Sequence, residues 1–206
     1  MTLLTDFRDE ARRRGVLAAD EAVTLGSAFR VVRDMPYARA TDRAEATVIR
    51  EWRGTCSGKH YLLAAILDAL GYEAAVLLAT HSFTADNAPW LPPALLDEVR
   101  RGPVPDVHTF LRVRSDPVAD EWMTIDATWP LSAGALGLPV NARLTPGIDQ
   151  RIACEIEEII HVPDDEDPQA MKERILELHA GDEAARRDLF IEALASWLAA
   201  STGAGR

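Results

Sequence analysis

The sequence predicts an α+β fold in which a long apolar helix, carrying a cysteine at its start, packs on a small antiparallel sheet. Three observations predict it. A dense apolar run follows Cys56 and stops at Gly71, which is typical of a buried helix with a glycine end. A short apolar segment over 73–80 and two alternating segments over 108–114 and 121–126 are typical of strands. Helical patterns flank this middle region on both sides, as in α+β proteins.

The helices expected before the cysteine have polar or turn-forming residues at their boundaries. They are 5–14 before Gly15, 20–34 after an Asp20 cap, and a short helix through Glu51 with Asp42 and Glu45 as a capping box.

After Trp129 a loop is expected, then a strand over 152–162 and a closing helical pair over 168–200. Helix starts are expected at Asp167-Pro168 and at Asp182. The apolar stripe that should dock the last helix consists of Leu189, Phe190, Ala193, Leu194 and Trp197.

A long proline-rich connection over 81–106 interrupts the central pattern. Connections of this length are usually functional or disordered in compact domains, so we interpret it as an insertion or lid with a short helix over 94–101. A turn at Ser115-Asp116-Pro117 should join the two alternating strands. We detect no internal boundary, so residues 1–206 are expected to form a single domain.

The composition restricts the classes of partner. With 22 basic and 33 acidic residues, the 206-residue chain has a net charge of −11, which repels phosphate backbones and anionic membranes. Nucleic acid and membranes are therefore not expected partners. No segment reaches the roughly 18 apolar residues of a membrane span, and the acidic N-terminus does not resemble a secretion signal. We expect a cytoplasmic protein.

The two cysteines, Cys56 and Cys154, are expected to be free thiols in a reducing compartment. The positive end of a helix and a nearby imidazolium lower a thiol pKa, and the free N–H groups of the first turn can donate to an oxyanion. Cys56 is therefore a candidate nucleophile. Cys154 lies in the run expected to form a strand, so we interpret it as a core residue or as simply inert.

A nucleophilic thiol needs a base and a group that orients the base. His108 opens one predicted strand and Asp126 closes the next. If these strands pair antiparallel, the imidazole and the carboxylate become close cross-strand neighbours. The order Cys56, His108, Asp126 along helix, strand and strand therefore fits a catalytic triad.

These residues resemble the transglutaminase-like branch of the papain-related cysteine enzymes over roughly residues 35–130. The resemblance is carried by GTCSGKHYLLAAILDALGYEAAVLLA, HTFLRV and EWMTIDATW, with Gly54, Cys56, Leu70-Gly71, His108, Trp122, Asp126 and Thr128 at the motif positions. It implies a papain/transglutaminase-like core and an acyl-enzyme on Cys56. The implied activity is that of a thiol hydrolase, such as a cysteine protease or amidase, or of an amide-forming acyltransferase. A peptide, amide or thioester substrate is implied, without a cofactor.

Some positions differ from the usual family pattern. Lys59 and His60 stand where an acidic or aromatic pair is common, and Thr109-Phe110 follows His108 in place of alanine and an aromatic residue. The interval of 52 positions from Cys56 to His108 is long, which fits an insertion. These differences leave the substrate class open.

Several alternatives remain open from the residues alone. Cys56 could be a small buried side chain in a catalytically silent binding module, or His60, four residues after it, could be the base. A metal site is not expected, because the candidate ligands Cys56, His60, His81 and His108 lack paired C-x-x-C spacing.

The segment GTCSGK is also not a phosphate-binding loop, since its glycine spacing is one residue short of the Walker pattern. Trp52 and Trp129 are expected to be walls of the site. Tyr37 or Trp52 could supply a second oxyanion donor.

Overall fold

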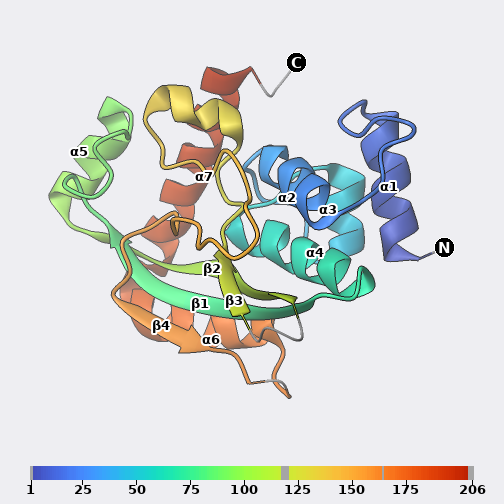
Figure 1. Ribbon diagram of the computed structural model, residues 1–206. Coiled ribbons are helices and arrows are strands. Elements are labelled where there is room, and N and C mark those ends of the chain that lie inside the picture. The colour runs from blue at the N-terminus through green and yellow to red at the C-terminus, as the bar shows by residue number, and fades with distance from the viewer. Residues whose placement is uncertain (1, 117–120, 164, 204–206) are drawn as a thin grey trace.

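The computed structural model describes residues 2–116, 121–163 and 165–203 (Figure 1). Its helices are α1 (Leu3–Arg13), α2 (Leu25–Asp34), α3 (Glu45–Glu51), α4 (Cys56–Ala69), α5 (Pro93–Arg101), α6 (Pro168–Ala180) and α7 (Ala184–Thr202), with short 3-10 turns at Leu131–Leu136 and Gly181–Glu183. Its strands are β1 (Glu73–Phe83), β2 (Val104–Asp116), β3 (Glu121–Ile125) and β4 (Glu158–His161).

The four strands form one sheet in the order β3-β2-β1-β4, and each neighbouring pair is antiparallel. Figure 1 shows the curved sheet beneath α4, with α1 and α5 at opposite sides of the molecule. The predicted α+β class, with a cysteine-bearing helix packed on a small antiparallel sheet, is confirmed.

The helix α4 is the centre of the larger hydrophobic cluster. Its apolar residues, including Leu62, Leu63, Ile66 and Leu67, are buried against α1, α2, α3 and the β1 and β2 strands. The helix ends as predicted, since Gly71 follows its last turn with a φ of 85°, in the left-handed region that favours glycine. Burial on most faces fixes the position of the Cys56 backbone.

A second hydrophobic cluster joins α5 and α7 to the end of the sheet. Phe190 and Leu194 of α7 are buried in it, together with Leu95 and Val99 of α5. Leu189 was expected in the same stripe, but it is 69% exposed, because it lies on the opposite face of α7. Ala193 of the predicted stripe is exposed as well, so the last helix docks on the body although the prediction was wrong at these two positions.

Two of the helix starts predicted before α4 were wrong. The second helix begins at Leu25 and not near Asp20, because Thr24 and Ser27 cap it reciprocally. The α3 helix follows Ala44, which gives no side-chain cap. The Asp42 carboxylate instead accepts from the Ala44 N–H at 2.9 Å and so orders the preceding turn.

The long connection is shorter than predicted. Residues 81–83 extend β1 and residues 104–106 begin β2, because these segments pair with each other across the sheet. Ser115 and Asp116 of the predicted turn belong to β2, and Pro117 lies outside the described residues.

The predicted strand over 152–162 was too long, since β4 spans only Glu158–His161. Cys154 lies in the irregular segment before it. There the Ala153 N–H donates to Asp126 and not to a neighbouring strand, which removes the ladder bond that a strand would need. The predicted helix start at Asp182 falls in a 3-10 turn, and α7 begins at Ala184.

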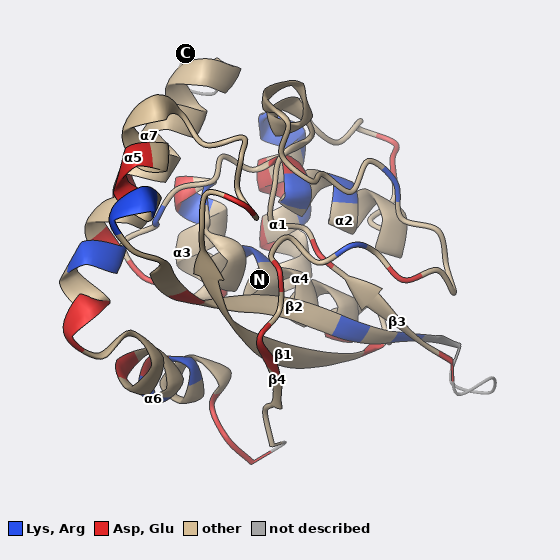
Figure 2. Cartoon of the chain, turned by 90° about the vertical axis from the view of Figure 1, so that its left-hand side faces the viewer, with Lys and Arg blue, Asp and Glu red and all other residues tan. Residues whose placement is uncertain are grey.

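Charged residues of both signs are interspersed on the helices (Figure 2). Short-range pairs such as Arg100–Asp97 and Arg101–Glu98 of α5 join them. Among the described residues, no helix is both long and apolar enough to cross a membrane.

Candidate active site

Cys56 is the first residue of α4 and is 4% exposed. The N–H groups of the first turn have no acceptor within the helix and surround the sulfur with positive partial charge. Gly54 allows this turn to form, because a Cβ there would meet the Lys59 backbone nitrogen at 3.0 Å. The small residues before Cys56 therefore let the incoming loop pass close to the helix start.

His108 and Asp126 form the predicted contact. The His108 Nε2 and the Asp126 Oδ2 are 2.8 Å apart, and both side chains are buried. Asp126 also accepts from the backbone N–H groups of Ala153 at 2.8 Å and Thr128 at 3.0 Å. Burial opposes ionisation, but the His108 charge and the hydrogen bonds from His108 and Thr128 outweigh it and hold the pKa of the Asp126 carboxyl well below its usual value.

The second ring nitrogen of His108, Nδ1, is available to interact with Cys56. Since Nε2 bonds to Asp126, Nδ1 is the ring nitrogen left to interact with Cys56, whose thiol pKa His108 lowers. Burial alone would lower the pKa of His108, but Asp126 and the sulfur raise it to about 10. The imidazole is therefore protonated at neutral pH, and it lies between a carboxylate and a thiol.

A residue that the sequence did not single out completes the site. Lys172 of α6 is 1% exposed, and its Nζ lies 3.4 Å from the Cys56 Sγ and 3.1 Å from the Thr109 Oγ1. Thr109 in turn contacts the Ser57 hydroxyl at 3.2 Å. Burial raises the pKa of the Cys56 thiol, but the Lys172 charge and the His108 interactions lower it to about 5.

Lys172 was missed because a single lysine in a charged amphipathic helix resembles a surface residue. One signal could have found it. The chain has 22 basic residues but only two lysines, Lys59 and Lys172, and both are buried.

His60 does not have the geometry of a catalytic base. Its Nδ1 lies 2.7 Å from the Cys56 carbonyl oxygen, so it carries the proton and donates, while its Nε2 accepts from the Ala127 N–H at 2.9 Å. Burial lowers the pKa of His60 to about 4, so the ring is neutral and both nitrogens are engaged by the backbone. His60 joins the start of α4 to the chain after β3.

Lys59 also has a structural explanation. Its Nζ donates to the carbonyl oxygens of Arg33 at 2.8 Å and Thr128 at 2.9 Å. Burial lowers the pKa of Lys59 to about 7. The residue therefore ties α4 to the end of α2 and to the segment that carries Asp126.

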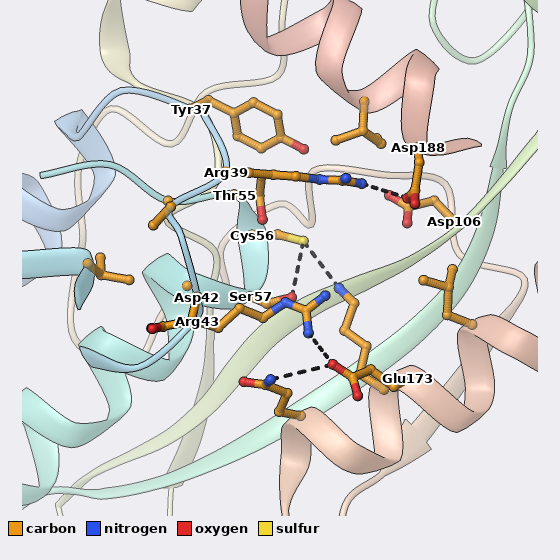
Figure 3. A pocket seen from close by; sticks show the side chains of 18 of the residues that line it. Tyr37, Arg39, Asp42, Arg43, Thr55, Cys56, Ser57, Asp106, Glu173 and Asp188 are labelled. Atoms are coloured by element: carbon orange, nitrogen blue, oxygen red, sulfur yellow. Dashed lines mark hydrogen bonds and ion pairs between the residues drawn. The ribbon is translucent and has the colours of Figure 1, made fainter. Parts of the chain in front are cut away.

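A cavity of about 390 Å³ reaches the sulfur. Of the three predicted triad residues, only Cys56 lines it, while His108 and Asp126 are buried and do not line it. Two ion pairs cross the cavity, each joining the segment before α3 to a C-terminal helix (Figure 3). They are Arg39–Asp188 at 2.7 Å and Arg43–Glu173 at 2.8 Å.

A buried ion pair lies in the cavity wall. Arg187 of α7 donates to the Asp106 carboxylate at 2.5 Å and 2.9 Å, and the His81 Nε2 lies 3.7 Å from the same group. The Arg187 charge outweighs burial and holds the pKa of Asp106 well below its usual value. Among the described residues, no group of three or more His, Cys, Asp or Glu side chains could hold a metal ion.

The three predicted aromatic residues differ in position. Tyr37 lines the cavity, and burial raises the pKa of its hydroxyl well above the usual value, so it keeps its proton. Trp129 does not line the cavity, because it packs behind Tyr37 with ring centroids 4.7 Å apart. Trp52 is also not a wall. It ends α3 with a left-handed φ of 54°, and its ring stacks on Phe7 in the larger core cluster.

Cys154 has a different environment from Cys56. It is partly exposed, both cysteines are free, and burial with nearby negative charges raises the pKa of Cys154 well above its usual value. Its thiol is therefore protonated and a poor nucleophile at neutral pH.

Comparison with known proteins does not assign the chain to a family. No protein-family model matches the chain, and no curated protein gives a significant sequence match.

Proposed function

We propose that this protein is a cysteine-dependent acyl-transfer enzyme that forms an acyl-enzyme on Cys56. The observation that carries the proposal is the pairing of a low-pKa thiol with His108, whose other nitrogen is held by Asp126 at 2.8 Å. An inert buried cysteine needs neither a cationic neighbour nor an oriented imidazole.

The proposed reaction starts from a Cys56 thiolate and a His108 imidazolium. The sulfur attacks the substrate carbonyl carbon, a C–S bond forms, and the carbonyl electron pair moves to oxygen. When this intermediate collapses, the bond to the leaving group breaks and the leaving group takes the His108 proton. The products are a thioester on Cys56 and a neutral imidazole.

The second half of the reaction uses His108 as a base. The neutral imidazole removes a proton from water or an amine as that molecule attacks the thioester, and collapse of the intermediate expels the Cys56 thiolate. Water gives an acid, as in a peptidase or amidase, whereas an amine gives a new amide. Asp126 holds the proton of His108 Nε2 and thus keeps Nδ1 directed at the sulfur throughout.

The assignment to the transglutaminase-like branch of papain-related enzymes is part of the proposal. It is supported by the ordered set Gly54, Cys56, His108 and Asp126, and by a cysteine-bearing helix packed on an antiparallel sheet. The cavity at Cys56 would receive the peptide, amide or thioester substrate that this family membership implies.

The test uses 4-nitrophenyl acetate as an acyl donor, with peptide mass spectrometry to locate the acetyl group. We expect acetylation of Cys56 and not Cys154, loss of the adduct in Cys56→Ala, and slower acetylation in His108→Ala and Asp126→Asn. Cys154→Ser is the matched control and should react like the wild type. Equal acetylation of both cysteines, insensitive to His108, would contradict the proposal.

The same adduct separates the two activities. After acetylated protein is freed of reagent, its decay is followed in buffer and in buffer with methylamine. Faster decay with formation of N-methylacetamide indicates an acyltransferase, whereas methylamine-independent decay indicates a hydrolase.

A further inference from the structure

We propose that Lys172 is a catalytic residue that donates a hydrogen bond to the oxyanion formed when Cys56 attacks a carbonyl. This inference rests on the proposed acyl-transfer function and assigns a group to it from outside the motif-bearing segment. Lys172 lies 116 positions beyond Cys56 in the sequence, on α6.

The position of the ammonium group is the first argument. An oxyanion on the attacked carbon is two bonds from the sulfur. A donor 3.4 Å from the Cys56 Sγ is therefore within range of the roughly 2.7–3.1 Å that an oxyanion contact needs. Lys172 also lines the cavity from which a substrate would reach the sulfur. Thr109 accepts a second hydrogen bond from the ammonium at 3.1 Å and holds it in place.

The direction of charge movement is the second argument. As the C–S bond forms, negative charge leaves the sulfur and appears on the carbonyl oxygen. A fixed cation that faces both atoms keeps its counter-charge throughout, and an ionised oxygen accepts a shorter and stronger hydrogen bond than sulfur does. The contact thus becomes stronger in the transition state than in the resting state, which is the condition for catalysis.

Burial strengthens this interaction. Lys172 is 1% exposed and Cys56 is 4% exposed, so bulk water screens their interaction poorly. The N–H of Cys56 at the start of α4 provides a backbone donor beside the same oxygen. Together the ammonium and the helix start would form a two-donor oxyanion site.

The alternative is that Lys172 stabilises only the resting thiolate. Two reagents separate these roles. Iodoacetamide alkylates a thiolate by displacement at a saturated carbon and forms no oxyanion, whereas 4-nitrophenyl acetate acylates it through a tetrahedral oxyanion. The leaving 4-nitrophenolate needs no proton, so once the Cys56 thiol is fully ionised His108 is not needed to expel it, and its effect on acetylation comes through ionisation of the thiol.

The experiment measures both limiting rates at Cys56 in Lys172→Met, at pH values where the Cys56 thiol of each protein is fully ionised. Cys154→Ser serves as the background in every protein, and circular dichroism checks folding. We expect alkylation to stay equal or rise slightly and acetylation to fall about 100-fold, the usual effect of losing one oxyanion donor. Lys172→Arg, which keeps a cationic donor, should recover part of the acetylation rate. It also serves as the test if Lys172→Met does not fold, since a guanidinium of different shape should then slow acetylation selectively.

Three results would overturn the inference while leaving the proposed function in place. They are an equal fall of both rates, no fall of either rate, and a selective fall of acetylation in Tyr37→Phe in place of the Lys172 variants. The last result would assign the second oxyanion donor to the Tyr37 hydroxyl. Absence of any acetylation of Cys56 in the wild-type protein would overturn the proposed function and this inference together.

Discussion

The two lysines of the chain are both buried, but they have opposite surroundings. Lys59 lies within the motif that follows Cys56, and its ammonium faces the carbonyl oxygens of Arg33 and Thr128. Lys172 lies on a C-terminal helix, and its ammonium faces the sulfur itself. The residue inside the recognisable motif therefore joins parts of the scaffold, and the residue outside it lies against the Cys56 sulfur.

This difference shows how the partner of a buried cation determines its role. Backbone carbonyls are neutral, so burial dominates for Lys59 and lowers its pKa to about 7. The thiol of Cys56 can ionise, so the Lys172 charge changes the state of the sulfur and lowers the thiol pKa. The predictions below separate a scaffold lysine from a site lysine.

The largest expected effect is on thiol ionisation in Lys172→Met. Loss of the cation should raise the pKa of Cys56 from about 5, and each unit lowers the thiolate fraction about tenfold at a pH below the midpoint. We therefore expect alkylation by iodoacetamide at pH 6 to slow about tenfold or more, measured as a rate profile from pH 4 to 9. A profile with an unchanged midpoint would show that Lys172 does not govern the thiol.

Lys59→Met should instead lower the free energy of unfolding. The variant leaves two buried carbonyl oxygens without this donor, which costs about 1–3 kcal/mol. Urea unfolding measures the change. The midpoint of Cys56 alkylation should stay near that of the wild type, and a shift as large as in Lys172→Met would remove the distinction between the two lysines.

His60 should behave as part of the Lys59 scaffold. Its pKa is lowered from 6.5 to about 4, so the unfolded chain binds more protons between these values and stability is lost as pH falls through this window. These values correspond to a loss of about 1–2 kcal/mol at pH 5. The loss should be smaller in His60→Gln, as measured by urea unfolding at pH 7 and 5. An unchanged acid dependence would show that His60 does not remain neutral in the folded protein.

The smallest expected effect comes from the ion pair beside Lys172. Arg43 and Glu173 are partly exposed, so Arg43→Ala should change the free energy of unfolding by less than about 1 kcal/mol. The alkylation midpoint should also stay near the wild-type value, because Lys172 is held by buried contacts. A large shift would mean that the ion pair, and not packing, fixes α6.

The sequence predicted the parts of the fold that depend on local pattern. The apolar run of α4, its Gly71 end and the alternating strands could be read because burial imposes a period on the residues. The His108–Asp126 contact followed from the antiparallel pairing of these strands. By contrast, helix starts such as Leu25 depended on which of several polar residues capped the turn, which local pattern does not decide.

The missed parts of the site depend on tertiary contacts. Lys172 reaches Cys56 only through the docking of α6, and no spacing in the sequence links the two. The errors at Trp52 and Trp129 arose in the same way, because nearness along the chain to Cys56 or Asp126 does not decide which side of a residue faces the cavity. The strand predicted around Cys154 does not form there, because the Ala153 N–H donates to the Asp126 carboxylate and not to a neighbouring strand.

The burial of both lysines affects whether one molecule of this protein could acylate another. All other basic side chains of fixed positive charge are arginines, so neither ε-amino group of the chain lies on the described surface. An acyltransferase that accepts amines can acylate the surface lysines of neighbouring copies of itself. This protein would offer no ε-amine for such cross-labelling, and its acyl group would remain available to an external amine or to water.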